Sequence, residues 1–183
     1  IVGSYLSEVT FIKGGGYAIA TNTGSNSVHM IFPDSKNIQC ETYTNGTSPV
    51  GTWQGTLDYS YADNEVSQTI AEIDLQGDST KALINLGFTP GYAAYKTSND
   101  ELWVSDATNG RVVIFTNSAG TWTQMHTITT GANAHAITFN ADESLAYVSN
   151  QDAGTVSVIN TATHTKTKDI TVGQKPNGIV LKQ

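Results

Sequence analysis

The sequence has few charged residues, one cysteine and no long apolar run. Only 14% of its 183 residues are charged, and the single Cys40 excludes a disulfide within the chain. A helix that spans a bilayer needs about 20 consecutive apolar residues, and no stretch approaches that length. The formal net charge of −7 disfavours nonspecific attraction to nucleic-acid phosphates. We therefore expect no membrane span and no nucleic-acid partner.

Familiar catalytic motifs are also missing. The chain contains no Gly-x-Ser-x-Gly, Cys-x-x-Cys, His-Glu-x-x-His or phosphate-loop pattern. Its four histidines occur singly, and its acidic residues are scattered over the chain. Because transition-metal sites need clustered ligands, we expect no catalytic residue set, no metal and no cofactor.

What the chain does contain is a regular alternation of strands and turns, clearest between Gly131 and Gly173. Four strand-like segments begin there at Ile137, Leu145, Thr155 and Lys168. The segments between them are rich in Asn, Asp, Thr and Gly, which favour tight turns. Short strands bounded by such turns are typical of β-hairpins. The stretch therefore predicts a four-stranded antiparallel meander.

This unit recurs along the whole chain with a period of about 40–45 residues. The repeats start at Gly3, Gly46, Gly87, Gly131 and Gly173. Four strands per repeat at this period are typical of β-propeller blades. We therefore expect an all-β fold with four antiparallel blades arranged radially in one propeller. The expected blades cover residues 3–45, 46–86, 87–130 and 131–172, and residues 173–183 should form the first strand of a further blade.

Three segments carry a resemblance to a known family: Tyr147–Asn150 (YVSN), Thr155–Asn160 (TVSVIN) and Val172–Ile179 (VGQKPNGI). They resemble the YVTN family of β-propeller repeats. The resemblance implies a ring of seven blades and a place in surface-layer or other exported proteins. Related seven-bladed propellers include lactonases, metal-dependent lyases and cofactor-binding dehydrogenase subunits.

Against a seven-bladed ring, this chain offers four blades and two stubs. The stubs are Ile1–Val2, which matches the end of an outer strand, and Ile179–Leu181, which matches a first strand. An unpaired apolar strand edge favours association. We expect either further blades of a longer ring or self-association with a second copy that completes the ring.

One residue per repeat lies at the mouth of the expected central tunnel: Ser7, Val50, Gly91, His135 and Asn177. The polar members, His135, Asn177 and Ser7, are the candidate tunnel-mouth residues. His135 could act as a ligand or base there. The alternative is a histidine that only makes hydrogen bonds at the rim.

The second repeat has the most aromatic segment, with Trp53, Tyr59 and Tyr61 before a loop that contains Glu65. Aromatic rings beside a polar loop can stack on sugars, so these residues are candidates for a binding loop. The alternative is that the rings fill space between blades.

Another recurring position carries an Asn or Asp directly after each expected second strand: Asn22, Asp63, Asp106 and Asn150. Such side chains bond nearby backbone amides and tolerate unusual turn dihedrals. We interpret this position as structural.

The function that these observations favour is a binding or scaffold module for a protein or carbohydrate partner. Its place would be extracellular, at the cell surface or in the periplasm. The alternative is part of a propeller enzyme, of the lactonase, lyase or dehydrogenase-subunit type, with its site at the central tunnel. Fold alone does not decide between them.

Overall fold

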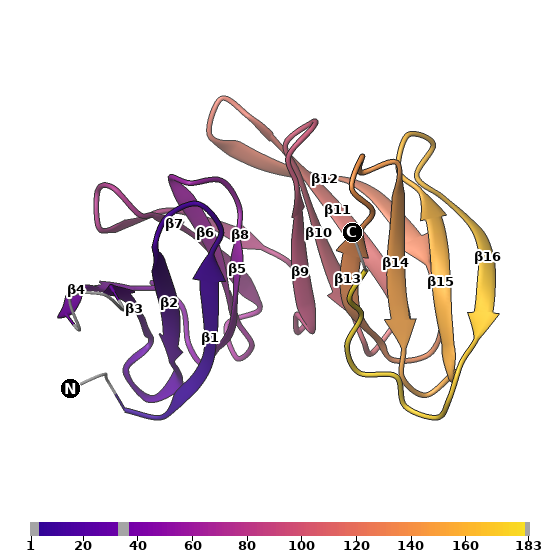
Figure 1. The fold of residues 1–183 in the computed structure, drawn as a ribbon, viewed down its shortest axis with the longest axis horizontal. Helices are drawn as coiled ribbons and strands as arrows, with labels where there is room; N and C mark the ends of the chain where they lie inside the picture. Colours follow the sequence, from indigo (N-terminus) through magenta and orange to yellow (C-terminus); the bar gives the residue numbers. More distant parts are fainter. Residues whose placement is uncertain (1–3, 33–36, 182–183) are drawn as a thin grey trace. The chain divides into compact units, whose positions relative to one another are not determined.

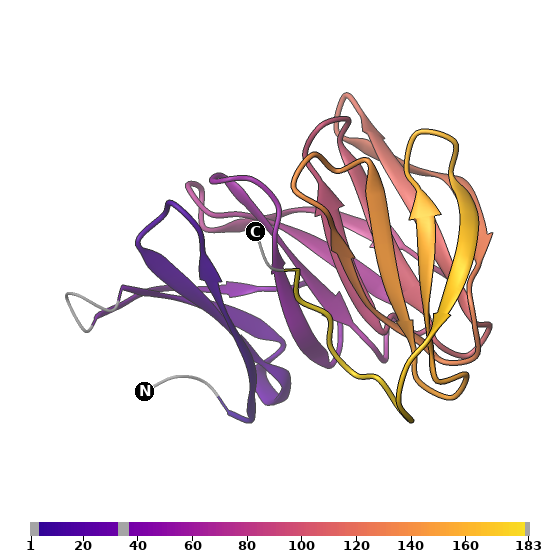
Figure 2. The same ribbon diagram turned by 45° about the vertical axis from the view of Figure 1, so that its right-hand side comes forward.

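The structure is a computed structural model that describes residues 4–32 and 37–181. The chain divides into two compact units, Ile1–Pro90 and Gly91–Gln183. Each unit contains two antiparallel four-stranded sheets, and within each sheet the strands follow one another in chain order. Figures 1 and 2 show the four strands of each sheet side by side, with a marked twist. The prediction of an all-β fold built from antiparallel meanders is confirmed.

The first unit holds the first and second sheets. The strands of the first sheet are β1 (Leu6–Ile12), β2 (Tyr17–Asn22), β3 (Ser27–Phe32) and β4 (Asn37–Tyr43), with a short 3-10 helix, η1 (Thr23–Ser25), between β2 and β3. The strands of the second sheet are β5 (Pro49–Gln54), β6 (Tyr59–Asn64), β7 (Thr69–Asp74) and β8 (Ser79–Asn85).

The second unit holds the third and fourth sheets. The strands of the third sheet are β9 (Tyr92–Lys96), β10 (Glu101–Asp106), β11 (Arg111–Ser118) and β12 (Thr121–Thr129). The strands of the fourth sheet are β13 (Ala134–Phe139), β14 (Leu145–Asn150), β15 (Thr155–Asn160) and β16 (Thr165–Thr171). Among the described residues, no helix is long and apolar enough to cross a membrane.

The turn between the second and third strands has the same backbone geometry in every sheet. The residue that precedes the third strand has a left-handed backbone, and these residues are Asn26, Gln68, Gly110 and Gly154, with φ between 54° and 62°. Glycine and asparagine adopt this conformation readily. The short polar turns of the sequence therefore reverse the chain at matching places in each repeat.

Each unit is held together by an apolar core between its two sheets. In the first unit, Ile19, Val28 and Met30 of the first sheet pack with Ala71 and Ile73 of the second. In the second unit the core includes Trp103, Val112 and Ile114 from the third sheet, and Ala146, Val148 and Ile159 from the fourth. The small alanines on one face and larger side chains on the other let the sheets approach closely.

Two bulges recur in the sheets. The pairing of the third and fourth strands shifts register in all four sheets, for example between Met30 and Ile31. The pairing of the first and second strands shifts in three of them, between Leu6 and Val9, Pro49 and Thr52, and Ala134 and Ile137. A bulge increases local twist and re-aims the side chains of the extra residue.

The structure corrects the repeat alignment by one residue in the second sheet. Asn64, not Asp63, pairs with the start of the third strand, as Asn22, Asp106 and Asn150 do in the other sheets. The shift arises because the hairpin between β5 and β6 is shorter than in the other repeats. All four aligned residues are fully buried, and Asn150 accepts a hydrogen bond from the N–H of Gly131 and donates to Thr155 Oγ1. This supports their structural interpretation.

Of the two predicted stubs, the structure describes only Ile179–Leu181. The structure assigns no strand to Ile179–Leu181, which follows β16 as an irregular segment. A strand needs a hydrogen-bonded neighbour, and no described strand pairs with this segment. The other stub, Ile1–Val2, lies outside the described residues. The assignment of either stub to a further blade stays a prediction.

Candidate functional site

The predicted tunnel-mouth position is a bulge residue. Ser7, Val50 and His135 each lie within the register shift at the start of β1, β5 and β13. Ser7 is exposed, and Val50 and His135 are half-buried. A residue in a bulge does not make the regular backbone hydrogen bonds between strands, and its side chain can point toward other contacts.

A side chain from the second strand stabilises each bulge. Thr21 Oγ1 accepts a hydrogen bond from the N–H of Glu8 at 3.2 Å, and Ser149 Oγ accepts one from the N–H of Ala136 at 3.0 Å. The same place in the third sheet is taken by Ser105. These hydroxyls satisfy amide groups that the bulge removes from the strand ladder.

In the second sheet, Asp63 takes the place of the hydroxyl residue. Its Oδ1 accepts hydrogen bonds from the N–H groups of Gly51 at 2.5 Å and Val50 at 3.3 Å. The residue is 2% exposed. Burial raises the pKa of the Asp63 carboxyl group to about 7; the charge of Glu65 adds to the rise, and the two hydrogen bonds oppose it. A carboxyl group that titrates near neutral pH therefore lies inside a strand bulge.

A second carboxyl group lies close to this bulge. Glu8 follows Ser7 on β1, and its Oε2 lies beside Gly51, at 3.0 Å from where a Cβ would stand. Burial raises the pKa of Glu8, against a hydrogen bond from the backbone of Thr52. Sequence reasoning missed both carboxyl groups. The alignment that places Asn64 with Asn150 would have revealed Asp63 as an acid at a Ser/Thr position.

In the second unit, the structure brings together two of the predicted tunnel-mouth residues. His135 Nδ1 donates to the backbone oxygen of Asn177 at 3.0 Å. Asn177 Oδ1 accepts from Gln151 Nε2 at 2.6 Å, and Gln151 Oε1 accepts from Asn133 Nδ2 at 3.1 Å. A chain of polar contacts thus links β13, the turn after β14 and the segment after β16.

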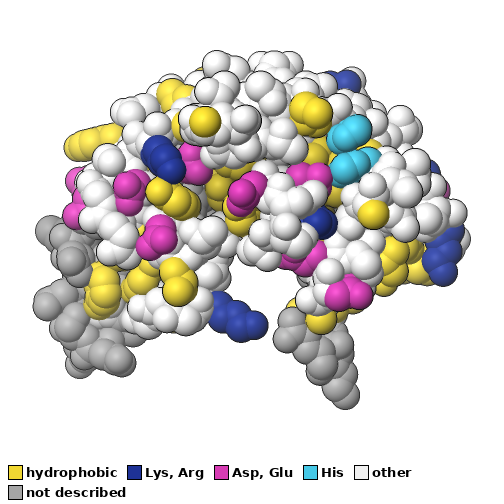
Figure 3. All heavy atoms as spheres, turned by 90° about the horizontal axis from the view of Figure 1, so that it is seen from above, with side chains coloured by type: hydrophobic (Ala, Val, Ile, Leu, Met, Phe, Trp, Pro, Cys, Tyr) yellow, Lys and Arg dark blue, Asp and Glu magenta, His cyan; other side chains and the backbone are white. Residues whose placement is uncertain are grey.

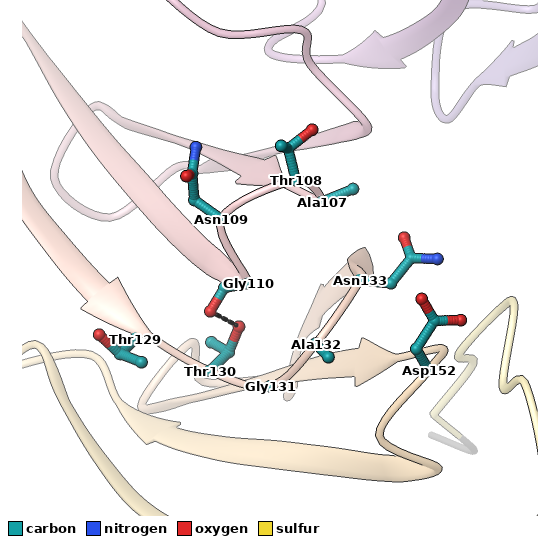
Figure 4. Close-up of a pocket in the computed structure, with 10 residues that line it drawn as sticks. All are labelled: Ala107, Thr108, Asn109, Gly110, Thr129, Thr130, Gly131, Ala132, Asn133 and Asp152. Atoms are coloured by element: carbon teal, nitrogen blue, oxygen red, sulfur yellow. Dashed lines mark hydrogen bonds between the residues drawn. The ribbon is translucent and has the colours of Figure 1, made fainter.

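This network borders a polar pocket of about 600 Å³ in the second unit. Three connections line the pocket: the turn between β10 and β11, the loop between β12 and β13, and Asp152 in the turn after β14. Figure 4 shows Asn133 and Asp152 pointing into the same space, with Ala107 and Thr108 across from them. A smaller hollow of about 270 Å³ lies on the other side of Asp152, next to Gln174 and Lys175.

The turn before β11 and the loop before β13, which both line the pocket, approach each other closely at Gly110. Gly110 has φ +60°, and a Cβ there would stand 2.8 Å from the backbone oxygen of Gly131. In the first unit, Asn26 occupies the equivalent position, and its Oδ1 accepts a hydrogen bond from the N–H of Ser48. A side-chain hydrogen bond of asparagine thus ties the turn to the loop in the first unit, whereas in the second unit the turn and the loop are in close backbone contact at the glycine.

The three aromatic candidates lie on strands and are buried or half-buried. Trp53 and Tyr61 are buried, and the Tyr61 hydroxyl donates to Glu72 Oε1. Tyr59 is half-buried beneath Lys81, whose Nζ lies 3.9 Å from the ring centroid. Glu65 follows the far end of β6, so it does not share a site with Tyr59. These positions support the alternative that the rings fill the protein interior.

A further polar cluster lies between the third and fourth sheets. The imidazole rings of His126 and His164 stack with centroids 4.1 Å apart. His164 Nε2 donates to Glu101 Oε1 at 2.8 Å, and Trp103 Nε1 donates to Glu101 Oε2 at 2.8 Å. Among the described residues, no group of three or more His, Cys, Asp and Glu side chains is arranged to hold a metal ion. Through Glu101, the cluster forms a hydrogen-bonded brace between β10 and the turn before β16.

Charged side chains are dispersed over the face seen in Figure 3, where Lys and Arg lie apart from one another among Asp and Glu. The excess of acidic residues, 16 against 9 basic ones, makes the surface favourable to cationic partners.

Comparison with solved structures identifies the fold class as a β-propeller. The chain resembles the β-propeller domain of Cps50 (Swd1) from Myceliophteria thermophila, with a TM-score of 0.79 and 10% identity over 96% of this chain and 57% of that one. It also resembles a putative 6-phosphogluconolactonase from Bacteroides fragilis, with a TM-score of 0.78 and 18% identity over 94% and 56%. A third similar structure is hydrazine synthase from Kuenenia stuttgartiensis, with a TM-score of 0.81 and 14% identity over 94% and 53%.

The chain thus spans little more than half the length of these structures. At such low identities the likeness concerns the fold alone, because propellers carry many unrelated functions. No protein-family model matches the sequence, and no curated protein matches it.

Proposed function

We propose that the chain is an extracytoplasmic binding module that recognises a protein or glycan partner with the loops of its second unit. The observation that carries this proposal is the polar pocket of about 600 Å³ built from three connections of two adjacent sheets. Binding sites are concave and hold a few well-placed polar groups. The resemblance to YVTN repeats, and the low charge with abundant Thr and Asn, support a place at the cell surface or in the periplasm.

The rigidity of the pocket supports the same function. Its loops are joined by backbone hydrogen bonds from Gln151 to Asn133 and from Asp152 to Ala132. Thr130 Oγ1 donates to the backbone oxygen of Gly110 at 3.1 Å, as Figure 4 shows. A site held in place before binding loses little conformational entropy when a partner docks.

The experiment that tests the proposal is a binding screen on a printed glycan array and a defined peptide array. Thr108→Arg, which places a long side chain at the pocket, is expected to weaken every selective interaction at least tenfold. Thr123→Arg makes the same change on the exposed strand β12 and serves as the control. Selective binding that survives Thr108→Arg, or no selective binding on either array, would count against the proposal.

The enzyme alternative rests on His135. Because its Nδ1 donates to Asn177, Nε2 is the nitrogen that can accept a proton. A lactonase- or lyase-type reaction would need further groups beside it. The binding function therefore remains the better supported of the two.

A second proposal concerns the first sheet, where one face is uncovered. Thr10 and Ile12 face the second sheet, since Thr10 Oγ1 donates to the backbone of Thr52 and Ile12 belongs to the shared core. Val9 and Phe11 alternate with them and are 46% and 72% exposed. The corresponding face of the second sheet packs against the first sheet.

We propose that the fourth sheet of a second copy covers this face. Its Tyr147 and Val156 stand at the strand positions of Ile19 and Val28, which the first sheet buries against the second. The contact would thus continue the packing already present within each unit. In a two-fold dimer the fourth sheet of each chain would cover the first sheet of the other, so the same pair of faces meets twice and the contact is isologous.

Phe11→Lys is expected to shift the chain from dimer to monomer in sedimentation velocity at micromolar concentration. The reason is that a charged side chain in an apolar interface costs several kcal/mol. Val66→Lys, at an exposed turn residue, is the matched control. A wild-type chain that stays monomeric up to high concentration would contradict the proposed pairing.

A further inference from the structure

Asp152 is the charged residue among the ten that line the pocket. Its side chain is exposed, and no hydrogen bond or ion pair among the described residues uses its carboxylate. A ligand could therefore bind the carboxylate without breaking a hydrogen bond or ion pair within the described part of the chain.

The fold does not require an acid at this place. The equivalent residue, two positions after the end of the second strand, is Gly24, Val66 or Thr108 in the other sheets. Four turns that each place a left-handed residue before the third strand thus carry four chemically different side chains. Turn geometry alone gives no reason for the charge of Asp152.

Asn133 presents an acceptor rather than a donor to the pocket, and the Asn109 side chain is turned away from Asp152 (Figure 4). Asn133 turns its Nδ2 toward Gln151 Oε1, so its Oδ1 is left for a ligand. Asn109 uses its Nδ2 on Asp106 Oδ2 at 2.7 Å. Figure 4 shows the Asn133 amide and the Asp152 carboxylate pointing into one space. Negative charge and free acceptor oxygens select a ligand group that is positive and rich in N–H donors.

We propose that this pocket binds the guanidinium or ammonium group of an arginine or lysine side chain in a partner polypeptide. The inference rests on the proposed function and names the chemistry that the site recognises. Charge-assisted N–H···O⁻ hydrogen bonds are the stronger ones in proteins, and guanidinium matches a carboxylate in two parallel bonds. A volume of about 600 Å³ accepts a long side chain together with neighbouring backbone.

The test uses small probes whose only difference is charge. N-acetyl-arginine methylamide is titrated into the ¹⁵N-labelled chain, and its neutral isostere N-acetyl-citrulline methylamide is titrated in parallel. The arginine probe is expected to shift the amide signals of Thr108, Asn133 and Asp152 saturably. The citrulline probe should bind at least tenfold more weakly. Asp152→Asn should weaken arginine binding about tenfold and leave citrulline binding unchanged.

Asp142→Asn is the control, since it removes the same charge from an exposed turn at the opposite end of β14. Equal binding of the two probes, no binding of either, or equal loss with Asp142→Asn would overturn the inference. A glycan or neutral peptide that binds in a Thr108-dependent way without any preference for arginine would leave the binding function standing and remove only the cationic specificity.

Discussion

Asp63→Ser is expected to stabilise the first unit by roughly 2–4 kcal/mol at pH 8 and by much less at pH 4. The carboxyl group of Asp63 is buried inside the bulge of β5, and its pKa is raised to about 7. Above that pH the folded chain must hold a buried negative charge that the unfolded chain exposes to water. Serine is the residue that two other sheets have at this place, and Ser149 there accepts an amide hydrogen bond.

The direction in which stability changes with pH follows from the direction of the pKa shift of Asp63. The folded state binds the proton of Asp63 more tightly than the unfolded state, whose carboxyl group titrates near 3.8. Well below pH 3.8 both states are protonated and there is no penalty. As the pH rises from about 4 to about 7, the unfolded state ionises first, and the stability of the wild-type unit falls.

Urea denaturation at pH 4, 6 and 8, followed by the fluorescence of Trp53 in the first unit, measures the effect. Asp58→Ser removes an exposed acid of the same unit and is expected to change stability by less than about 0.5 kcal/mol at every pH. A wild-type stability that does not fall with rising pH, or a serine variant less stable than wild type at pH 8, would contradict the burial of a charged carboxyl group.

The repeat pattern made the fold predictable, because each repeat carries the same local information. Turn clusters rich in Asn, Asp and Gly bound every hairpin, and the left-handed backbone at Asn26, Gly110 and Gly154 shows why those residue types recur. The extent of the strands was less predictable. β13 begins at Ala134 rather than Ile137, since the bulge extends pairing toward the preceding loop. The aligned acid of the second repeat was misplaced by one residue for a different reason, the shorter hairpin between β5 and β6, which composition does not reveal.

The candidate site was predictable only in part. The repeat alignment indicated His135 and Asn177, and the structure places them in contact. The alignment did not indicate Asp152 or the pocket, because the pocket is formed by three connections from two sheets that lie apart in the sequence. For Trp53 and Tyr61 the sequence left two interpretations open, since aromatic residues near a loop are common both in cores and in binding sites, and their burial favours the first.

Trp103→Ala is expected to destabilise the second unit by about 3–5 kcal/mol. Trp103 is fully buried in the core of that unit, and its ring meets Phe139 edge to face at 5.4 Å. Alanine would leave a cavity between the two sheets. It would also deprive the buried Glu101 of the Nε1–H donor at 2.8 Å, so a carboxylate with little exposure would lose one of its hydrogen bonds.

Two further variants separate these contributions. Trp103→Phe keeps most of the ring volume but removes the donor to Glu101, and is expected to cost about 1–3 kcal/mol. Tyr147 occupies the same strand position in the fourth sheet and is only half-buried. Tyr147→Ala is therefore expected to destabilise the second unit by less than about 2 kcal/mol. Differential scanning calorimetry with urea denaturation measures all three. A Tyr147→Ala cost equal to that of Trp103→Ala would contradict the core placement of Trp103, and a Trp103→Phe variant as stable as wild type would contradict the brace through Glu101.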